Sequence, residues 1–413
     1  MVLVRKEDIT KTLKVVYEKI NSGVLENYWT GFKPLPIAFY DNSHVYIIGL
    51  SELPEGFNKE DEIFVGEWDN RFIGNTSIKF QEGYIGIWDL STVEEFTTFS
   101  EFYSKIVHEI FHGFQLSNND KRFANEFLAF QYPFTVENIA LRIKEREYLL
   151  KGVFEDKKNL KRDYMKKFIS CREKRRSIIK EFLDYELGLE SIEGTATYVE
   201  YRALFDESCL PEKFLISVFG KDLIKVTDLN KFRMSCYSPG MYISLLLDCI
   251  KPDWKKEYTY ENKYIYDYFV DIVSLEFENV EIDDQTVNLA REAVEKHKKE
   301  LDKVFKNFET SGKYKVVLTG KFSLAGFDPM NILKSGNKLL HKNFLKFGSS
   351  ESTYFVKGPV ISEFEDEIWQ YSKVIFYSNK KPELKDDNAV FIDKIGIIKG
   401  KLTEENNTFL IES

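Results

Sequence analysis

The stretch KIVHEIFHGFQ, residues 105–115, decides how this sequence is interpreted. The chain has five histidines in 413 residues, and two of them, His108 and His112, stand four positions apart with Glu109 directly after the first. In an α-helix, residues four apart lie on the same side, about 40° apart around the axis and one turn along it. The two imidazoles can therefore reach one point in space, with the carboxylate of Glu109 beside it.

Two imidazoles on successive turns suit Zn²⁺, which neutral histidine nitrogens bind at about 2.1 Å. A carboxylate next to a metal-bound water can accept a proton from it, because the metal lowers the pKa of that water. The stretch therefore predicts a zinc site with His108 and His112 as ligands and Glu109 as general base. The alternative is an amphipathic helix that carries two histidines by accident.

Helical periodicity predicts a helix over about 92–115. Ser91 and Glu94, or the next pair along the chain, can form a capping box at its start. Gly113 has no side chain, so another element can approach the helix closely there. The side opposite the histidines is expected to pack into the core. The apolar residues on that side are Phe99, Phe102, Tyr103, Ile106, Ile110 and Phe114.

A catalytic zinc needs a third protein ligand and an open position for water. The remaining histidines, His44, His297 and His341, lie in a strand-turn region, a highly charged helix and the C-terminal region, and none has a supporting pattern. Carboxylates further along the chain are better candidates, because zinc also accepts glutamate oxygen. The third ligand is therefore sought among the glutamates that follow the first helix.

The segment LESIEGTATYVEYRAL, residues 189–204, mixes glutamates with glycine, alanine and threonine. Small residues allow this helix to lie close against the first one, and only at short range can a carboxylate reach a zinc ion held there. Glu193 is the predicted third ligand, with Glu190 as the next candidate or as a support for the ligands. Glu200, two turns from Glu193 on nearly the same side, is predicted to orient a ligand. The alternative is a surface helix with exposed glutamates.

HEIFH followed by IEGTATY resembles the gluzincin metallopeptidases, the group of thermolysin and aminopeptidase N. In that group the third zinc ligand is a glutamate on a later helix, often in an E-G-x-A context. The resemblance therefore implies one zinc ion per chain, with Glu193 as its third ligand, and hydrolysis of peptide bonds. It is distant, and it rests on short motifs over about 75–250.

A second segment, CYSPGMYISLLLD at 236–248, resembles the Y-x-K-G-A segment of the aminopeptidase N relatives. In those proteins the tyrosine hydroxyl donates a hydrogen bond to the tetrahedral intermediate. Tyr237 matches that tyrosine by position, just before a helix that is predicted to start at Ser238 and Pro239. The resemblance implies that Tyr237 stabilises the oxyanion, and the alternative is an ordinary buried tyrosine.

The sequence departs from the gluzincin pattern in three ways. The 80 residues between His112 and Glu193 far exceed the short spacer of thermolysin or aminopeptidase N. Pro239 stands where the family has a lysine, and the G-x-M-E-N strand that binds the amino terminus of the substrate in the aminopeptidases is absent. The resemblance therefore supports the zinc site and the reaction type more than the choice of substrate.

The chain is predicted to be α+β. Short apolar or aromatic runs separated by turn residues indicate a β-rich part over 33–90, and helical periodicity dominates over 92–310. Within the β-rich part, residues 75–90 occupy the place of the edge strand that binds extended substrate in the gluzincin fold, or form an ordinary core strand. Together the two parts make up the predicted zincin-like catalytic region, 1–311.

A small β-rich C-terminal domain of unknown role is predicted over 312–413, because short strands with glycine or asparagine turns follow Gly312. A basic helical insertion is predicted at about 120–180. Within it, residues 151–180 hold 12 Lys or Arg and 4 Asp or Glu, a local charge of 12 − 4 = +8. This stretch is either an arm that contacts anions or nucleic acid, or a solvated helical face on an acidic body.

Composition and charge disfavour several classes of protein. Hydrophobic residues make up 43% of the chain, which is enough for a sizeable core. The net charge of −9 provides no basic field to attract phosphates, so binding of nucleic acid by the chain as a whole is disfavoured. No apolar run is long enough to span a bilayer, and no signal peptide is recognisable. With four scattered cysteines, the protein is expected to be cytoplasmic with free thiols and no membrane partner.

These observations predict a zinc metallopeptidase that acts on peptide or protein substrates. Two other functions stay open. One is a catalytically inactive binding protein that keeps the peptidase body with structural zinc, and the other is a zinc amidohydrolase that acts on a non-peptide amide. No oligomeric state is predicted from the sequence.

Overall fold

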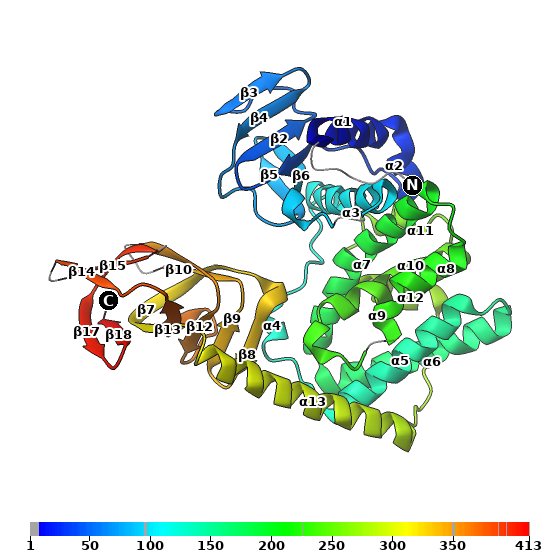
Figure 1. The fold of residues 1–413 in the computed structure, drawn as a ribbon. Helices are drawn as coiled ribbons and strands as arrows, with labels where there is room; N and C mark the ends of the chain where they lie inside the picture. Colours follow the sequence, from blue (N-terminus) through cyan, green and yellow to red (C-terminus); the bar gives the residue numbers. More distant parts are fainter. Residues whose placement is uncertain are drawn as a thin grey trace. The chain divides into compact units, whose positions relative to one another are not determined.

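A computed structural model describes residues 8–94, 97–224, 226–348, 352–386, 388–393 and 395–412 (Figure 1). These residues fall into two compact units. Unit 1 comprises the described residues up to Asn125 together with Thr135–Ala290, and unit 2 comprises Glu126–Phe134 together with the described residues from Arg291 onward. Along the chain, a β-rich part is followed by a helical part and a second β-rich part, which confirms the α+β prediction.

Unit 1 starts with two helices and a six-stranded sheet, in the region predicted to be β-rich. The helices are α1 (Ile9–Lys19) and α2 (Leu25–Tyr28), joined by a π-helical turn at Ile20–Val24. The strands are β1 (Ile37–Tyr40), β2 (His44–Ile48), β3 (Phe57–Glu60), β4 (Ile63–Glu67), β5 (Thr76–Phe80) and β6 (Gly83–Asp89). Their order is β3-β4-β2-β1-β6-β5, and only β1 and β6 run parallel among these neighbours. The predicted edge segment 75–90 thus contains an edge strand, β5, and an inner strand, β6.

The helix α3 (Phe99–Ser117) carries the two histidines. It starts later than predicted, because Leu90–Thr92 form a separate 3₁₀ turn. The capping box therefore uses Thr98 and Glu101 instead of Ser91 and Glu94. The amide of Glu101 donates to the hydroxyl of Thr98 (3.2 Å), and the amide of Thr98 donates to the carboxylate of Glu101 (2.9 Å).

Two glycines let the sheet come close to α3. A Cβ atom on Gly86 of β6 would lie 2.6 Å from Cγ2 of Ile110, and one on Gly113 would lie 2.9 Å from the hydroxyl of Ser77 in β5. The hydroxyl of Ser77 also donates a hydrogen bond to the carbonyl of Glu109 (2.6 Å). The close approach predicted at Gly113 is therefore confirmed, and the edge strand lies directly against the histidine-bearing turns.

The helical part of unit 1 is arranged around α7. Its helices are α5 (Val136–Phe154), α6 (Lys158–Ile179), α7 (Phe182–Glu207), α8 (Glu212–Phe219), α9 (Lys221–Ile224), α10 (Tyr237–Ile250), α11 (Trp254–Tyr258) and α12 (Ile265–Val273). Most of the predicted basic insertion is α5 and α6. Buried residues occur on every side of α7, glutamates among them, so it lacks the single apolar stripe of a surface helix. The alternative of a surface helix over 189–204 is therefore wrong.

At a pair of glycines, α7 and α10 are in contact. A Cβ atom on Gly240 would lie 2.1 Å from the carbonyl oxygen of Glu190, and one on Gly194 would lie 2.6 Å from the Cα atom of Gly240. Both obstacles are backbone atoms, which cannot rotate aside as a side chain can. The small residues of 189–204 are predicted to bring α7 close to α3, but Gly194 serves the contact with α10.

Unit 2 combines α4 (Glu126–Ala129), the part of α13 (Asp284–Phe308) from Arg291 onward and the β-rich C-terminal part. The strands are β7 (Tyr314–Phe327), β8 (Ile332–Ser335), β9 (Lys338–His341), β10 (Phe344–Gly348), β11 (Thr353–Lys357), β12 (Val360–Phe364), β13 (Gln370–Ser378), β14 (Glu383–Asp386), β15 (Ala389–Ile392), β16 (Gly396–Lys399), β17 (Lys401–Glu405) and β18 (Thr408–Glu412). Strands β14, β15 and β16 pair with one another, and the others belong to a nine-stranded sheet. The boundary differs from the predicted one near Gly312, because Phe308 of α13 packs with the sheet residues Val317 and Leu340.

The segment 126–134 belongs to unit 2 through its aromatic side chains. The ring of Phe127 lies 5.6 Å from that of Trp369, and the ring of Phe130 lies 5.8 Å from that of Phe327. Both phenylalanines pack against the core of the nine-stranded sheet. This short segment, which follows α3 in the chain, therefore packs against side chains of the second β-rich part.

Two expectations concern the chain as a whole. Among the described residues, every helix is too short or too polar to cross a bilayer. All four cysteines, Cys171, Cys209, Cys236 and Cys249, are free thiols, two of them buried and two exposed. The prediction of free thiols is therefore in line with the structure.

The glycine contact predicts that Gly240→Ala destabilises unit 1. The added methyl would overlap the carbonyl of Glu190, so α7 and α10 must separate, and we expect the free energy of unfolding in urea to fall by about 1–3 kcal/mol. Gly152→Ala in α5 is the matched control, because its methyl would meet no heavy atom closer than 3.7 Å and alanine favours the helix. Equal stability of the two variants would rule out the proposed overlap.

His341 in β9 is a buried histidine that stays neutral. Its Nε2 lies 3.0 Å from the hydroxyl of Ser362, and burial lowers the pKa of His341 to about 3. The pKa of an unfolded histidine is about 6.5. Between these two values the unfolded chain binds a proton that the folded chain does not, so this group favours folding fully above pH 6.5 and progressively less toward pH 3.

The buried imidazole therefore predicts a specific acid sensitivity of unit 2. We expect its contribution to the free energy of unfolding to fall by about 1.4 kcal/mol for each pH unit below 6.5. In His341→Leu this share of the pH dependence should disappear, whereas His44→Leu, at an exposed position, should keep it. The measurement is the free energy of unfolding between pH 4 and pH 8, and an unchanged slope in His341→Leu would show that the imidazole is not responsible.

Candidate metal centre

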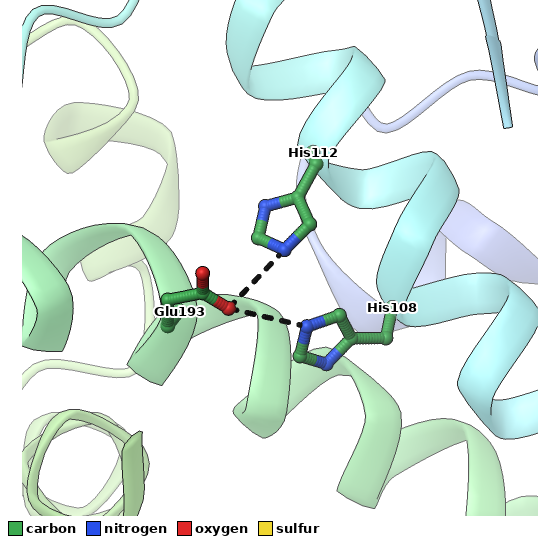
Figure 2. Close-up of side chains that lie close together, drawn as sticks. All are labelled: His108, His112 and Glu193. Carbon is green, nitrogen blue, oxygen red and sulfur yellow. Dashed lines mark ion pairs between the residues drawn. The ribbon is translucent and has the colours of Figure 1, made fainter. Parts of the chain in front are cut away.

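Two helices bring three predicted ligands together (Figure 2). His108 and His112 extend from α3 toward Glu193 on α7. The Nε2 atoms of His108 and His112 lie 3.6 Å and 3.4 Å from the same oxygen, Oε2 of Glu193. One ligand atom from each residue lies within 4.8 Å of the others, so the three residues form a group that can hold a metal ion.

A carboxylate two turns further along α7 holds the first histidine. Nδ1 of His108 lies 3.0 Å from Oε2 of Glu200, and a proton on Nδ1 would be donated to that oxygen. In the neutral imidazole this bond places the ring proton on Nδ1, so the lone pair of Nε2 would be available to a metal. Glu200 therefore lies where the prediction of an orienting residue places it.

The second histidine is held by a residue that sequence reasoning missed. Nδ1 of His112 lies 2.8 Å from Oε1 of Gln115. The amide nitrogen of Gln115 donates to the carbonyl of Ile192 and to the hydroxyl of Thr195, both at 3.0 Å. These two bonds fix which end of the amide accepts from the imidazole. The only signal in the sequence is a glutamine three residues after His112, next to apolar neighbours.

Besides the two histidines, the HEIFH stretch contains one more ionisable residue, Glu109. Burial raises the pKa of its carboxyl to about 7, with His108 and His112 opposing the shift and Glu193 and Glu200 adding to it. A group with this pKa can both accept and release a proton near neutral pH. Burial and the neighbouring charges thus hold the carboxyl of Glu109 close to the balance between its neutral and ionised forms.

The ligands themselves polarise one another. Burial disfavours the charged imidazole of His108, but its hydrogen bonds to Glu193 and Glu200 outweigh burial and raise its pKa. Burial also disfavours the charged carboxylate of Glu193, but the two histidines and Arg233 hold its pKa well below the usual range. The carboxylate therefore remains ionised, and it attracts positive charge to the point where the imidazoles meet.

Arg233 links Tyr237 to Glu193 of the predicted ligand set. Nη1 of Arg233 donates to the hydroxyl of Tyr237, and Nη2 of Arg233 donates to the other oxygen of Glu193, Oε1, at 3.2 Å. Tyr237 is the first residue of α10 and Cys236 is its N-cap, so the predicted start, with Ser238 as N-cap and Pro239 as first residue, is two residues late. The hydroxyl of Ser238 donates to the carbonyl of Phe219 (2.6 Å).

Glu190 does not reach the centre, contrary to the prediction. It is fully buried, and its Oε2 pairs with Nη1 of Arg172 on α6 at 2.5 Å. Three residues correspond to about 300° of rotation in a helix, so Glu190 leaves α7 in a direction about 60° away from Glu193. The arginine on α6 then draws it further from the histidines.

The basic stretch 151–180 fits neither predicted role completely. Most of it, from Lys158 to Ile179, is α6. Two of its arginines, Arg172 and Arg175, are fully buried. Both pair with glutamates of α5 and α7. Part of the positive charge of this stretch therefore forms buried ion pairs inside unit 1.

Known proteins do not help to define this centre. The chain matches no protein-family model, and no curated protein or solved structure is significantly similar to it. What the centre can do must therefore be inferred from its own residues and their arrangement.

Proposed function

We propose that the protein is a zinc-dependent metallopeptidase of the gluzincin type. His108, His112 and Glu193 would hold one zinc ion, and the observation that carries the proposal is the convergence of two Nε2 atoms on one oxygen of Glu193. A zincin-like catalytic region is part of the proposal, because a strand edge, a histidine-bearing helix and a later glutamate-bearing helix follow one another in unit 1.

The donor set and its spacing fit zinc. Two neutral imidazoles and a carboxylate are a common ligand set for catalytic zinc, with bonds of about 2.0–2.2 Å. Ligand atoms at tetrahedral angles around such an ion lie about 3.4 Å apart, and the distances from Glu193 to His112 and His108 are 3.4 and 3.6 Å. Both imidazoles also have a partner on Nδ1, which fixes the ring orientation that a metal needs.

Glu109 would act as the general base. When bound, zinc polarises the substrate carbonyl and lowers the pKa of an attacking water to about 7. The carboxylate of Glu109 would take a proton from that water and pass it to the nitrogen of the leaving amine. Without a cation nearby, burial raises the pKa of this carboxyl to about 7, and a bound zinc ion would lower it and favour the ionised form that accepts the proton.

Tyr237 would donate a hydrogen bond to the oxygen that gains negative charge. Arg233 donates to the hydroxyl oxygen of Tyr237, and a hydroxyl that accepts from a guanidinium is polarised into a stronger donor through its own proton. The same guanidinium bonds Glu193, which ties the position of the hydroxyl to that of the ligand set. A donor held at this place can contribute a large share of catalysis.

The substrate would be a peptide bound in extended form along β5. Among the described residues, β5 pairs with one neighbour, β6, so one of its edges can accept main-chain hydrogen bonds. Ser77 of β5 bonds the carbonyl of Glu109, so a peptide on this strand would pass the general base.

Metal analysis and the variant Glu109→Gln test the function. The purified chain should contain about one zinc, a chelator should abolish cleavage of a peptide library, and added zinc should restore it. Glu109→Gln should keep the zinc and lower kcat by a factor of about 10²–10⁴, because proton transfer is lost. Glu82→Gln, the same change at an exposed position, should leave kcat unchanged.

The outcomes separate this function from its rivals. Full activity in Glu109→Gln would refute the mechanism. A zinc-loaded chain that cleaves no peptide in a broad library would favour the non-catalytic binding protein, and chelator-sensitive cleavage of non-peptide amides alone would favour the amidohydrolase. Chain without zinc after purification in zinc-containing buffer would refute the metal site itself.

The bond between Gln115 and His112 predicts the effect of Gln115→Met. Without its acceptor the imidazole of His112 loses its fixed orientation, and the affinity for zinc should fall by a factor of about 10–100. Competition with a chelating dye measures this change. Ser117→Ala on the same helix removes only a hydroxyl that bonds the carbonyl of Gly113 (2.7 Å) and should bind zinc as the wild type does. Equal zinc affinity in both variants would show that Gln115 does not support the ligand.

A further inference from the structure

Unit 1 contains a cluster of buried charges among α5, α6 and α7, apart from the candidate metal centre. Every side chain in it is at most 1% exposed. The arginines are Arg142, Arg146, Arg172 and Arg175, and the glutamates are Glu145, Glu186 and Glu190. Burial of charge is costly unless each charge has a partner, so the pairing within this cluster decides what it can do.

The glutamates are all committed to three of the arginines. Glu145 pairs with Arg172 and Arg175, both at 2.8 Å. The other pairs join Glu186 to Arg142 (3.0 Å) and to Arg175, and Glu190 to Arg172 (2.5 Å). The fourth arginine, Arg146, takes part in none of these ion pairs.

Arg146 has no acceptor in the part of the chain that the structure describes. None of its three guanidinium nitrogens makes a hydrogen bond, and the side chain is 1% exposed. Burial and the neighbouring Arg142 lower the pKa of Arg146 to about 10, so it is still positively charged at neutral pH. Four arginines against three glutamates leave at least one positive charge uncompensated.

The polar partners of the neighbouring Arg142 do not supply the missing negative charge. Nη2 of Arg142 donates to the hydroxyl of Ser235 (2.8 Å) and contacts the sulfur of Cys236 at 3.5 Å. Burial raises the pKa of the Cys236 thiol to about 11, so it is neutral at physiological pH. Burial also raises the pKa of Glu190, which reduces the negative charge available and does not increase it.

We propose that Arg146 forms a buried binding site for a small monovalent inorganic anion, with chloride as the matching species. One net positive charge calls for one negative charge. The guanidinium presents five N–H donors, and a halide can accept from several donors without needing one of its own. Because the cluster is closed to solvent, a bulky organic anion does not fit the site. The inference does not depend on the zinc centre or on peptidase activity.

Thermal unfolding of the full chain tests the site. Its Tm is measured in sodium chloride and in sodium gluconate at equal ionic strength, because gluconate is too large to enter. In the wild type, chloride should raise Tm by about 2 °C or more, with saturation as its concentration increases. In Arg146→Met the response to chloride should be lost, and Tm in gluconate should equal or exceed that of the wild type, because an uncompensated buried charge has been removed.

Arg162→Met is the matched control, since Arg162 lies exposed on α6, and it should keep the chloride response. Identical wild-type Tm values in chloride and gluconate would overturn the proposal without reference to any variant. A chloride response that persists in Arg146→Met would overturn it too, since the anion would then bind elsewhere. Bromide, which scatters anomalously, should replace chloride and give a peak within hydrogen-bond distance of the guanidinium in crystals.

Discussion

The side-chain amide of Gln115 joins α3 to α7, and the candidate metal centre depends on that connection. Its nitrogen donates to the backbone of α7 at Ile192 and to Thr195, while its oxygen accepts from His112. One residue thus bonds the backbone of the second helix and orients an imidazole at the same time. Because Glu193 follows Ile192 directly, the third ligand is placed by the same contact.

The long helix α7 carries two separate charged assemblies. Toward α3 it directs Glu193 and Glu200, which meet the histidines, and toward α5 and α6 it directs Glu186 and Glu190, which meet arginines. A helix buried on all sides normally has apolar residues on all sides. Here the glutamates are tolerated because each side offers them partners, the imidazoles of α3 on one side and the arginines of α5 and α6 on the other.

The sequence was informative where chemistry demands particular residue types at a fixed spacing. The pair of histidines and the glutamate between them follow a helical repeat, so their common direction could be predicted from local geometry alone. Glu193 could be ranked first but not separated from Glu190, which stands one turn away with the same chemistry. What separates the two glutamates is Arg172 on another helix, and no local pattern shows which helix will lie opposite which side.

The same reason explains the other differences. Gln115 acts through backbone groups of α7, so its role exists only once the two helices are packed. The helix α3 starts later than predicted, because Leu90–Thr92 form a separate 3₁₀ turn. The boundary between the units lies before the predicted one, because Phe308 at the end of α13 packs with residues of the nine-stranded sheet. In each case tertiary contacts outweighed a sound local preference.

The segment 126–134 has a consequence for how the protein is made. Phe127 and Phe130 pack against residues of the nine-stranded sheet, and Phe327 follows Phe127 by 200 positions. During synthesis Phe127 and Phe130 leave the ribosome long before their packing partners have been made. Until then their apolar side chains are exposed to solvent, which favours misassembly or chaperone binding. Unit 2 can mature only when the last strands have been released.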